Sequence, residues 1–366
     1  MADVVILGAG LMGSAFSFPL ADVGHTVHLV GTHLDRAWIQ SVRDCGVHPK
    51  LKLKLPERVI AYTHDQLAEV LSRRPELIVL GVNSLGVDWA VENLGSLLKD
   101  PPPILMLTKG LRGREGNLQI LPHVVRDGLA RYGLEGVSVG GVAGPCIAGE
   151  LAMRRDSSTV ITYADAAALK QVMRFVAAPY YHARPSTDII GVEVCAGFKN
   201  LYTLAVGYPA GLLARLGEPA DGPRVHNLAA SLFAQGIREM CYIVAFLGGT
   251  PASPIGLPGV GDLYVTCQGG RNVRIGYLFG LGQRFSQARR DFPATETIEG
   301  AQFAAAIGPT MEAWFAEGRI ERRAMPLAAA MIDAVCHDAP LTIPWTEFHR
   351  NGRPGSFSIL LEGESE

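Results

Sequence analysis

The stretch Val4-Val5-Ile6-Leu7-Gly8-Ala9-Gly10-Leu11-Met12-Gly13 decides the fold of the amino-terminal half. The apolar, β-branched run at 4–7 is typical of a buried strand, and a GxGxxG motif follows it directly. In a strand–turn–helix unit these glycines allow the tight turn, the approach of a pyrophosphate to the backbone, and close packing of helix on strand. The phosphates would lie at the helix amino terminus. We therefore predict a dinucleotide site that includes Gly8, Gly10 and Gly13.

Short apolar runs alternate with helix-length segments through the first half of the chain. The runs lie at 26–30, 59–62, 77–81, 104–107 and 137–142, with another strand expected at 159–162. Runs that are apolar on both faces fit a parallel sheet covered by helices on both sides. This pattern predicts an α/β, doubly wound sheet through about residue 185.

The second half changes in composition. After Asp188 the β-branched runs end, and helical patterns cover 190–214, 225–247, 272–290, 298–317 and 325–337. Pro185 lies in a polar stretch between the two halves, and glycine and proline recur after Arg350. We expect a sheet domain at 1–187, an all-helical domain at 188–350, and a surface tail at 351–366.

Composition excludes several classes of protein. The 366 residues are 48% hydrophobic and 19% charged, which excludes a disordered chain, and a net charge of −2 gives no general attraction to nucleic acid or to an anionic membrane. No basic leader precedes the first strand, and charged residues interrupt the apolar stretches. The six cysteines form no CxxC pair. We expect a cytoplasmic protein with reduced thiols, no membrane insertion and no bound metal.

The end of the second predicted strand leaves the choice of dinucleotide open. No carboxylate stands at Val30-Gly31-Thr32-His33, where NAD-binding proteins hold the adenine ribose, and Asp35 and Arg36 come later. A carboxylate would favour NAD, whereas Arg36 with His33 would accept a 2′-phosphate. Both NAD and NADP remain possible.

Lys199 and Asn200 lie in the most apolar predicted helix, at 190–214. An unpaired ammonium is costly there, so Lys199 must pair or face a polar cleft. A lysine held beside other charges can have a pKa near neutrality, which suits proton exchange with a substrate hydroxyl. The alternative is a buried structural ion pair, and for Glu193 we expect a structural role.

The segment 261–272 combines an acid, a hydroxyl, a glycine pair and an arginine before a predicted helix. Gly269-Gly270, the helix amino terminus and the guanidinium of Arg271 favour an anion such as phosphate, and Asn272 adds an amide donor. A plain helix start with a surface arginine is the alternative. Lys109 and the segment 144–150 follow predicted strands, where α/β sheets bind ligands, although a surface lysine and an ordinary turn would fit as well.

Five motifs then occur in one order: GxGxxG, Thr108-Lys109-Gly110, Gly-Pro-x-x-Ala-x-Glu at 144–150, Lys199-Asn200, and Gly-Asp-Leu-x-x-Thr-Cys followed by Arg271-Asn272. In this the chain resembles the NAD(P)-dependent sn-glycerol-3-phosphate dehydrogenases over roughly residues 3–345. The resemblance implies a Rossmann-type domain and a helical domain like that of 6-phosphogluconate dehydrogenase. It also implies a homodimer that reversibly reduces dihydroxyacetone phosphate to sn-glycerol 3-phosphate and so feeds glycerophospholipid synthesis and carbohydrate metabolism.

The resemblance also implies roles for single residues. Lys199 matches the proton donor and acceptor, a second ammonium from Lys109 would keep Lys199 from holding its proton too tightly, and Asp262 would orient it. Further matches are the substrate-centre residues Asn200 and Thr266, the substrate-binding Gly144, the phosphate-binding Gly270, Arg271 and Asn272, and the cofactor-binding Gly8, Gly10, Leu11, Met12, Gly13, His33, Lys109, Ala148, Arg271 and Glu299.

Some positions depart from the family pattern. Cys146 stands where a serine is usual, Leu11-Met12 replaces an asparagine or aromatic pair, and Asn83-Ser84 replaces a turn that contains proline. The first two changes remove no catalytic group. Two other functions fit parts of the pattern: a dehydrogenase of the same plan that acts on a 2-hydroxy acid, a hydroxyacyl thioester or a ketopantoate-like acid, and a nucleotide-sensing regulator without catalysis. Arg271-Asn272 argues against the first. The joint presence of Lys109, Lys199, Asp262 and Arg271 argues against the second.

Overall fold

The computed structural model describes residues 1–217, 225–294 and 296–349 and divides into two compact units. The sheet unit consists of Met1–Lys109 and Ile120–Glu193, and the helical unit consists of Gly110–Gln119 and the described residues from Val194 onward. The boundary between the units therefore lies within the first two turns of the helix Ile189–Leu216. Residues 110–119, which form a hairpin in the first half of the sequence, belong to the helical unit. The expected tail at 351–366 lies outside the described residues.

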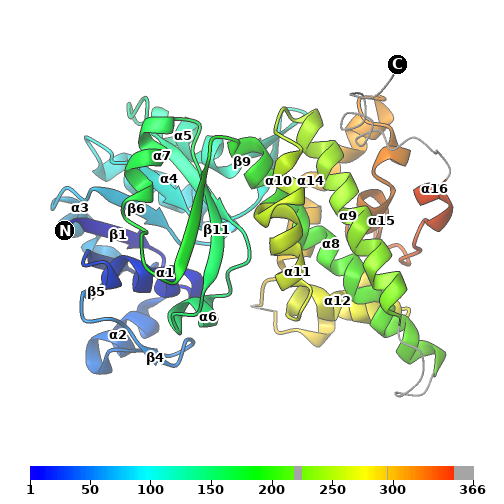
Figure 1. The fold of residues 1–366 in the computed structure, drawn as a ribbon, viewed down its shortest axis with the longest axis horizontal. Coiled ribbons are helices and arrows are strands. Elements are labelled where there is room, and N and C mark those ends of the chain that lie inside the picture. Colours follow the sequence, from blue (N-terminus) through cyan, green and yellow to red (C-terminus); the bar gives the residue numbers. More distant parts are fainter. Residues whose placement is uncertain (218–224, 295, 350–366) are drawn as a thin grey trace. The chain divides into compact units, whose positions relative to one another are not determined.

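The sheet unit is built on one eight-stranded sheet of order β12-β11-β10-β7-β6-β1-β2-β5 (Figure 1). Its neighbouring strands are parallel except β10 and β11, which are antiparallel. The bounds are β1 (Asp3–Leu7), β2 (Thr26–Val30), β5 (Val59–Tyr62), β6 (Leu77–Leu80), β7 (Ile104–Met106), β10 (Val139–Ala143), β11 (Ser157–Thr162) and β12 (Tyr181–Ser186). The predicted α/β fold with a Rossmann-type sheet is confirmed, and all seven predicted strands are present.

Helices cover both faces of this sheet because successive residues of most of its strands are apolar. Val4 and Ile6 of β1 point into one core and Val5 and Leu7 into the other. The first core is covered by α1 (Leu11–Asp22), α2 (Arg36–Cys45), α6 (Ala148–Ala152) and α7 (Ala166–Met173), and the second by α3 (Leu67–Leu71), α4 (Val87–Leu97) and α5 (Leu121–Ala130). Burial on both faces is what the continuous apolar runs predict.

The edge strand β12 was not expected from the sequence. Only Tyr181 of its six residues is fully buried, and Pro185 lies within it. Proline is tolerated at a sheet edge because its missing N–H faces no neighbouring strand. The polar, proline-containing pattern therefore indicates a linker although the residues pair with β11.

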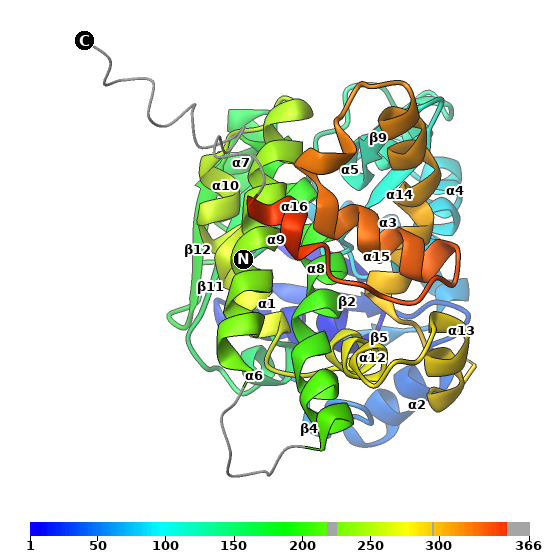
Figure 2. The same ribbon diagram turned by 90° about the vertical axis from the view of Figure 1, so that its right-hand side faces the viewer.

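The helical unit contains three long helices and several short ones (Figure 2). They are α8 (Ile189–Leu216), α9 (His226–Phe246), α10 (Ala252–Ile255), the π-helical turn η3 (Leu257–Gly261), α11 (Asp262–Thr266), α12 (Arg271–Gly280), α13 (Phe285–Ala288), α14 (Glu299–Ala316), α15 (Pro326–Cys336) and α16 (Trp345–His349). The helix expected at 272–290 is two helices, because the chain turns at Gly282, where φ is +93°.

A small hairpin, β8 (Leu111–Arg114) and β9 (Asn117–Ile120), packs against α14. The indole Nε1 of Trp314 donates to the carbonyl oxygen of Gly116 over 2.7 Å, and Arg319 donates to the same oxygen over 3.1 Å. These contacts explain why residues 110–119 belong to the helical unit. No local pattern in the sequence indicates them.

Helix α8 is the core of the helical unit. It is long and apolar enough to cross a membrane, but 89% of its most apolar 18-residue window is buried inside the protein, so it is a core helix. Glu239 of α9 joins three helices: it accepts from Tyr202 of α8 and from the backbone N–H groups of Leu327 and Ala328, which begin α15. Burial raises the pKa of Glu239 to about 7, and these hydrogen bonds oppose that rise.

Candidate functional site

Of the three motif glycines in the glycine-rich turn of the sheet unit, only Gly10 leaves room for a ligand. A Cβ on Gly8, whose φ is +112°, would lie 2.6 Å from the carbonyl carbon of Gly81, and one on Gly13 would lie 2.2 Å from the Gly8 oxygen. A Cβ on Gly10 would meet nothing closer than 3.8 Å. Gly8 and Gly13 are therefore needed for packing, and Gly10 leaves the backbone at the start of α1 accessible, as a pyrophosphate requires.

Two buried side chains hold this turn in place. Asp35 Oδ2 accepts from the backbone N–H of Ala9 over 3.1 Å and from the N–H and hydroxyl of Thr32, both over 2.9 Å. His48 accepts from the Leu51 N–H at Nδ1, so its Nε2–H donates to the Ala9 oxygen over 2.9 Å. Burial lowers the pKa of His48, which favours this neutral form. The turn is thus fixed by protein groups before any cofactor binds.

These supports were missed in the sequence, and one of them bears on the cofactor. Asp35 was weighed as a ribose ligand, but its Oδ2 faces the glycine turn. His33 is exposed after β2, with its ring 6.5 Å from that of His64, and Arg36 is exposed and pairs with Asp65 at 3.5 Å. The Thr32-x-x-Asp35 spacing just before α2 was the available signal that the Asp35 carboxylate bonds back to Thr32.

The remaining cofactor candidates of the sheet unit border α1. Leu11 is 45% exposed at the start of that helix, whereas Met12 and Ala148 are partly buried against the same core cluster. Ala148 begins α6, which packs on α1. The structure therefore brings Met12 and Ala148 to one side of the sheet.

Lys109, just after β7, carries the positive charge that acts on Glu193. Glu193 is fully buried, neither of its oxygens has a hydrogen-bond partner among the described residues, and Oε1 lies 1.9 Å from where a Cβ on Gly141 would be. Burial raises the pKa of Glu193 to about 8, and Lys109 lowers it in part. Gly144, with φ +126°, follows β10 in the same unit.

The helical unit holds Lys199 in a buried polar cluster. Its Nζ forms an ion pair with Asp262 and donates to Thr266 Oγ1 over 3.2 Å. Asp262 and Thr266 are four residues apart on α11 and so share one face of that helix, and Thr266 donates to the Asp262 carbonyl oxygen over 2.5 Å. Nearby, burial raises the pKa of Cys267 to about 11, so its thiol stays neutral. The segment 262–266, expected to precede a helix, is itself a helix that faces the lysine.

Asn200 and Asn272 meet each other. The amide nitrogen of Asn272 donates to Asn200 Oδ1 over 3.2 Å, and Asn272 Oδ1 accepts from the Gly300 N–H over 2.9 Å. The side chain of Asn272 thus joins α8, α12 and the start of α14. What this residue offers an anion is its backbone N–H in the first turn of α12.

Arg271 begins α12 and is held from one side by acidic and hydroxyl groups. Its guanidinium lies 3.9 Å from Glu296 and 3.9 Å from Glu299, and it donates to Thr297 Oγ1 over 3.3 Å. Gly270, at the helix amino terminus, has φ +96° with open space around its Cα, so backbone conformation requires the glycine there. The sequence missed Glu296 and Thr297, which no motif distinguishes.

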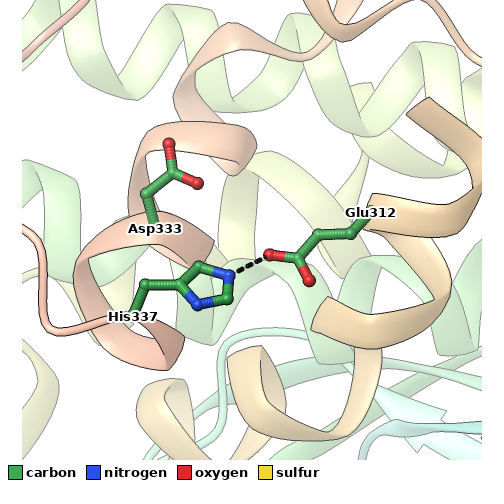
Figure 3. Close-up of side chains that lie close together, drawn as sticks. All are labelled: Glu312, Asp333 and His337. Atoms are coloured by element: carbon green, nitrogen blue, oxygen red, sulfur yellow. Dashed lines mark hydrogen bonds and ion pairs between the residues drawn. The ribbon is translucent and has the colours of Figure 1, made fainter. Parts of the chain in front are cut away.

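Another cluster in the helical unit has the residue types of a metal site. Oxygen and nitrogen atoms of Glu312, Asp333 and His337 lie within 4.8 Å of one another (Figure 3). The carboxylate of Glu312 bonds His337, however, and that of Asp333 bonds Arg322. Because both carboxylates have partners within the protein, we assign no metal to this cluster.

Comparison with known proteins agrees over both units. Residues 3–169 match the family described as NAD-dependent glycerol-3-phosphate dehydrogenase N-terminus, and residues 188–342 match its C-terminus. The NADP(+)-dependent glycerol-3-phosphate dehydrogenase of Archaeoglobus fulgidus is 31% identical over 288 residues, which are 79% of this chain and 83% of that protein. The glycerol-3-phosphate dehydrogenase [NAD(P)+] of an Exiguobacterium species is 32% identical over 78% of this chain and 79% of its own.

Solved structures show the same architecture. The crystal structure of glycerol-3-phosphate dehydrogenase from Coxiella burnetii has a TM-score of 0.76 and 25% identity, and the match covers 96% of this chain and 99% of that one. The enzyme from Plasmodium falciparum, 18% identical with a TM-score of 0.78 over 96% of each chain, supports the fold. The chain therefore belongs to the NAD(P)-dependent glycerol-3-phosphate dehydrogenase family of oxidoreductases.

Proposed function

We propose that this protein interconverts dihydroxyacetone phosphate and sn-glycerol 3-phosphate with Lys199 as the proton donor and acceptor. The observation that carries the proposal is the buried cluster of Lys199, Asp262 and Thr266, in the same unit as Arg271 and the amino terminus of α12. Reduction of a phosphorylated ketone needs a hydride, a proton and a site for the phosphate. The helical unit contains candidates for the last two.

Lys199 is suited to proton transfer because its position is fixed. The ion pair with Asp262 fixes one direction of its Nζ, and the hydrogen bond to Thr266 fixes a second. During reduction, Lys199 Nζ would give a proton to the developing alkoxide, and during oxidation it would take the proton from the hydroxyl. Asp262 would balance the charge of the protonated Lys199, before the transfer in reduction and after it in oxidation.

Arg271 and the start of α12 would hold the phosphate. The guanidinium supplies paired N–H donors, and the first-turn N–H groups after Gly270, which include that of Asn272, supply backbone donors. Asn200, fixed by the Asn272 side chain, would contact the substrate at the same centre as Lys199. The phosphate site would thus distinguish this substrate from an unphosphorylated 2-hydroxy acid.

The sheet unit would hold NAD or NADP at the glycine turn. When bound, the nicotinamide supplies the hydride that reduces the carbonyl carbon. Gly10 and the adjoining backbone leave space for the pyrophosphate, while Leu11, Met12, His33 and Ala148 would contact the nucleotide. We extend the cofactor contacts to Lys109, Arg271 and Glu299, and assign Gly144 to the substrate.

Steady-state oxidation of NADH and, separately, NADPH with dihydroxyacetone phosphate tests this function. We expect turnover with at least one cofactor, and we expect Lys199→Ala to abolish turnover while the dissociation constant of the nucleotide stays nearly unchanged. Retention of most of kcat by Lys199→Ala would refute its role as proton donor. Nucleotide binding without turnover of dihydroxyacetone phosphate by the wild type would refute the substrate assignment.

We further propose a cytoplasmic homodimer that supplies sn-glycerol 3-phosphate to glycerophospholipid synthesis. All six cysteines are thiols, which is consistent with a reducing compartment. The dimer and the pathway rest on the family alone. Light scattering after size exclusion tests the dimer, and loss of glycerophospholipid in cells without the protein tests the pathway.

A further inference from the structure

Arg289 makes an unusual set of contacts away from the proposed reacting groups. It is half-buried and directly follows α13. Its guanidinium donates to four backbone carbonyl oxygens, those of Phe292 and Pro293 over 3.1 Å and those of Ala294 and Glu296 over 3.0 Å. One side chain therefore fixes the carbonyl groups along a single stretch of chain.

That stretch has few other backbone hydrogen bonds among the described residues. Residues 292–294 and 296–298, which we name the pre-α14 loop, lie in neither a helix nor a strand. Two backbone hydrogen bonds involve its N–H groups, from Phe292 to Arg289 over 3.3 Å and from Glu296 to Pro293 over 3.0 Å. A planar guanidinium with five N–H donors can join several carbonyls at once, which a lysine ammonium cannot match in geometry.

Side chains of the same loop contact Arg271. Glu296 and Thr297 extend side chains to the Arg271 guanidinium, at 3.9 and 3.3 Å. Phe292, at the start of the loop, packs under Arg274 of α12, with the guanidinium 4.8 Å from the ring centroid. The loop is therefore held by Arg289 at its backbone and in turn holds the helix turn that carries Arg271.

The backbone of Arg289 is itself anchored. In the preceding helix α13, the N–H and hydroxyl of Ser286 donate to the carboxylate of Asp338 over 2.7 and 2.8 Å, and Arg284 donates to the Asp338 carbonyl oxygen over 2.7 Å. Asp338 follows α15. A continuous set of contacts thus runs from the end of α15 through Arg289 and the pre-α14 loop to Arg271.

We propose that Arg289 is a positioning residue for phosphate binding: it fixes the pre-α14 loop and thereby the direction in which Arg271 presents its guanidinium. The inference rests on the proposed function, because it takes Arg271 as the phosphate ligand. Arg289 does not touch the substrate in this scheme. Without Arg289, Glu296 and Thr297 are no longer held against the Arg271 guanidinium. Arg271 then binds an anion less well, while the proton donor Lys199 is unaffected.

The test compares Arg289→Met and Arg289→Lys with Arg290→Met as a matched control. Arg290 is the adjacent arginine, is exposed, and makes no hydrogen bond or ion pair in the part of the chain that the structure describes. The measurements are kcat, the KM for dihydroxyacetone phosphate, the dissociation constant of the nucleotide, and the dissociation constant of inorganic phosphate by calorimetry.

We expect Arg289→Met to raise the KM and the phosphate dissociation constant about tenfold or more, with kcat within about threefold and nucleotide binding unchanged. Arg289→Lys gives a smaller rise, and Arg290→Met behaves as wild type. Unchanged phosphate binding in folded Arg289→Met overturns the proposal. Equal losses in kcat, nucleotide binding and phosphate binding also overturn it, because they indicate a general structural role.

A second variant keeps the proposal testable if Arg289→Met does not fold. Thr297→Val removes the hydrogen bond between the loop and Arg271 and leaves Arg289 intact. It is expected to weaken phosphate binding, and its effect with Arg289→Lys is expected to be less than additive, because both act through one loop. An additive effect, or none, contradicts the proposal. Phosphate binding remains measurable if the wild type fails to turn over dihydroxyacetone phosphate, so failure of the proposed function is distinguishable.

Discussion

Replacement of Asp262 by asparagine tests whether Lys199 is a charged group held in a buried pair. The substitution keeps the size of the side chain and removes its charge. The side chains of Lys199 and Asp262 are 8% and 2% exposed, so water cannot replace the lost carboxylate. Thr266 remains within 3.2 Å of Nζ, but a neutral hydroxyl does not compensate an ammonium charge.

The size of the effect follows from this burial. Removal of one partner of a buried pair leaves the other charge uncompensated, which costs about 3–5 kcal/mol. We expect Asp262→Asn to lower the free energy of unfolding by this amount. Exposed ion pairs contribute far less, and the Arg323–Glu321 pair of the same unit, 59% and 60% exposed, provides the control. Glu321→Gln should leave stability unchanged within error.

Urea unfolding followed by circular dichroism measures both effects. A double-mutant cycle with Lys199→Met adds a second comparison, because replacement of both partners removes the charge that Asp262→Asn leaves unpaired. The double variant should therefore recover most of the stability that the single variant loses. A cost below about 1 kcal/mol for Asp262→Asn, or no recovery in the double variant, would refute the buried pair and with it the fixed proton donor.

Three further outcomes are expected. Arg271→Ala should raise the KM for dihydroxyacetone phosphate at least tenfold, equivalent to about 1.4 kcal/mol, and an unchanged KM in steady-state assays would place the phosphate elsewhere. Burial raises the pKa of Glu193 to about 8, so the stability that protonated Glu193 contributes is present below its ordinary pKa and is lost as pH rises through 8. In urea unfolding, the free energy of unfolding of Glu193→Gln should therefore gain up to about 5 kcal/mol over wild type between pH 4.5 and 9. Parallel pH profiles of the two proteins would contradict this. Gly13→Ala should weaken nucleotide binding at least tenfold by fluorescence titration, because its Cβ would lie 2.2 Å from the Gly8 oxygen, whereas Gly149→Ala, with nothing within 4 Å, should bind as wild type.

The sequence alone was sufficient for the fold class, the family and the positions of the main strands along the chain. The signals for these are local: an apolar run at 4–7, glycines at fixed offsets from it, and helical periodicity after Asp188. Local patterns predict secondary structure because side-chain burial repeats with the period of the element. The edge strand β12 and the hairpin β8–β9 escaped prediction because pairing and packing partners, not their own patterns, stabilise them.

Only the tertiary structure decided which polar groups meet. Lys199 and Asp262 are 63 residues apart, and Asn200 and Asn272 are 72 apart, so no spacing rule links them. The local pattern showed only that Lys199 lies in an apolar helix and needs a partner, and Asp262 was indicated for that role by the family resemblance alone. Nothing in the sequence indicated that Arg289 supports Arg271 through a loop. Contacts of this kind depend on how helices pack around one core, and the burial that gives each charge its energy exists only once the chain has folded.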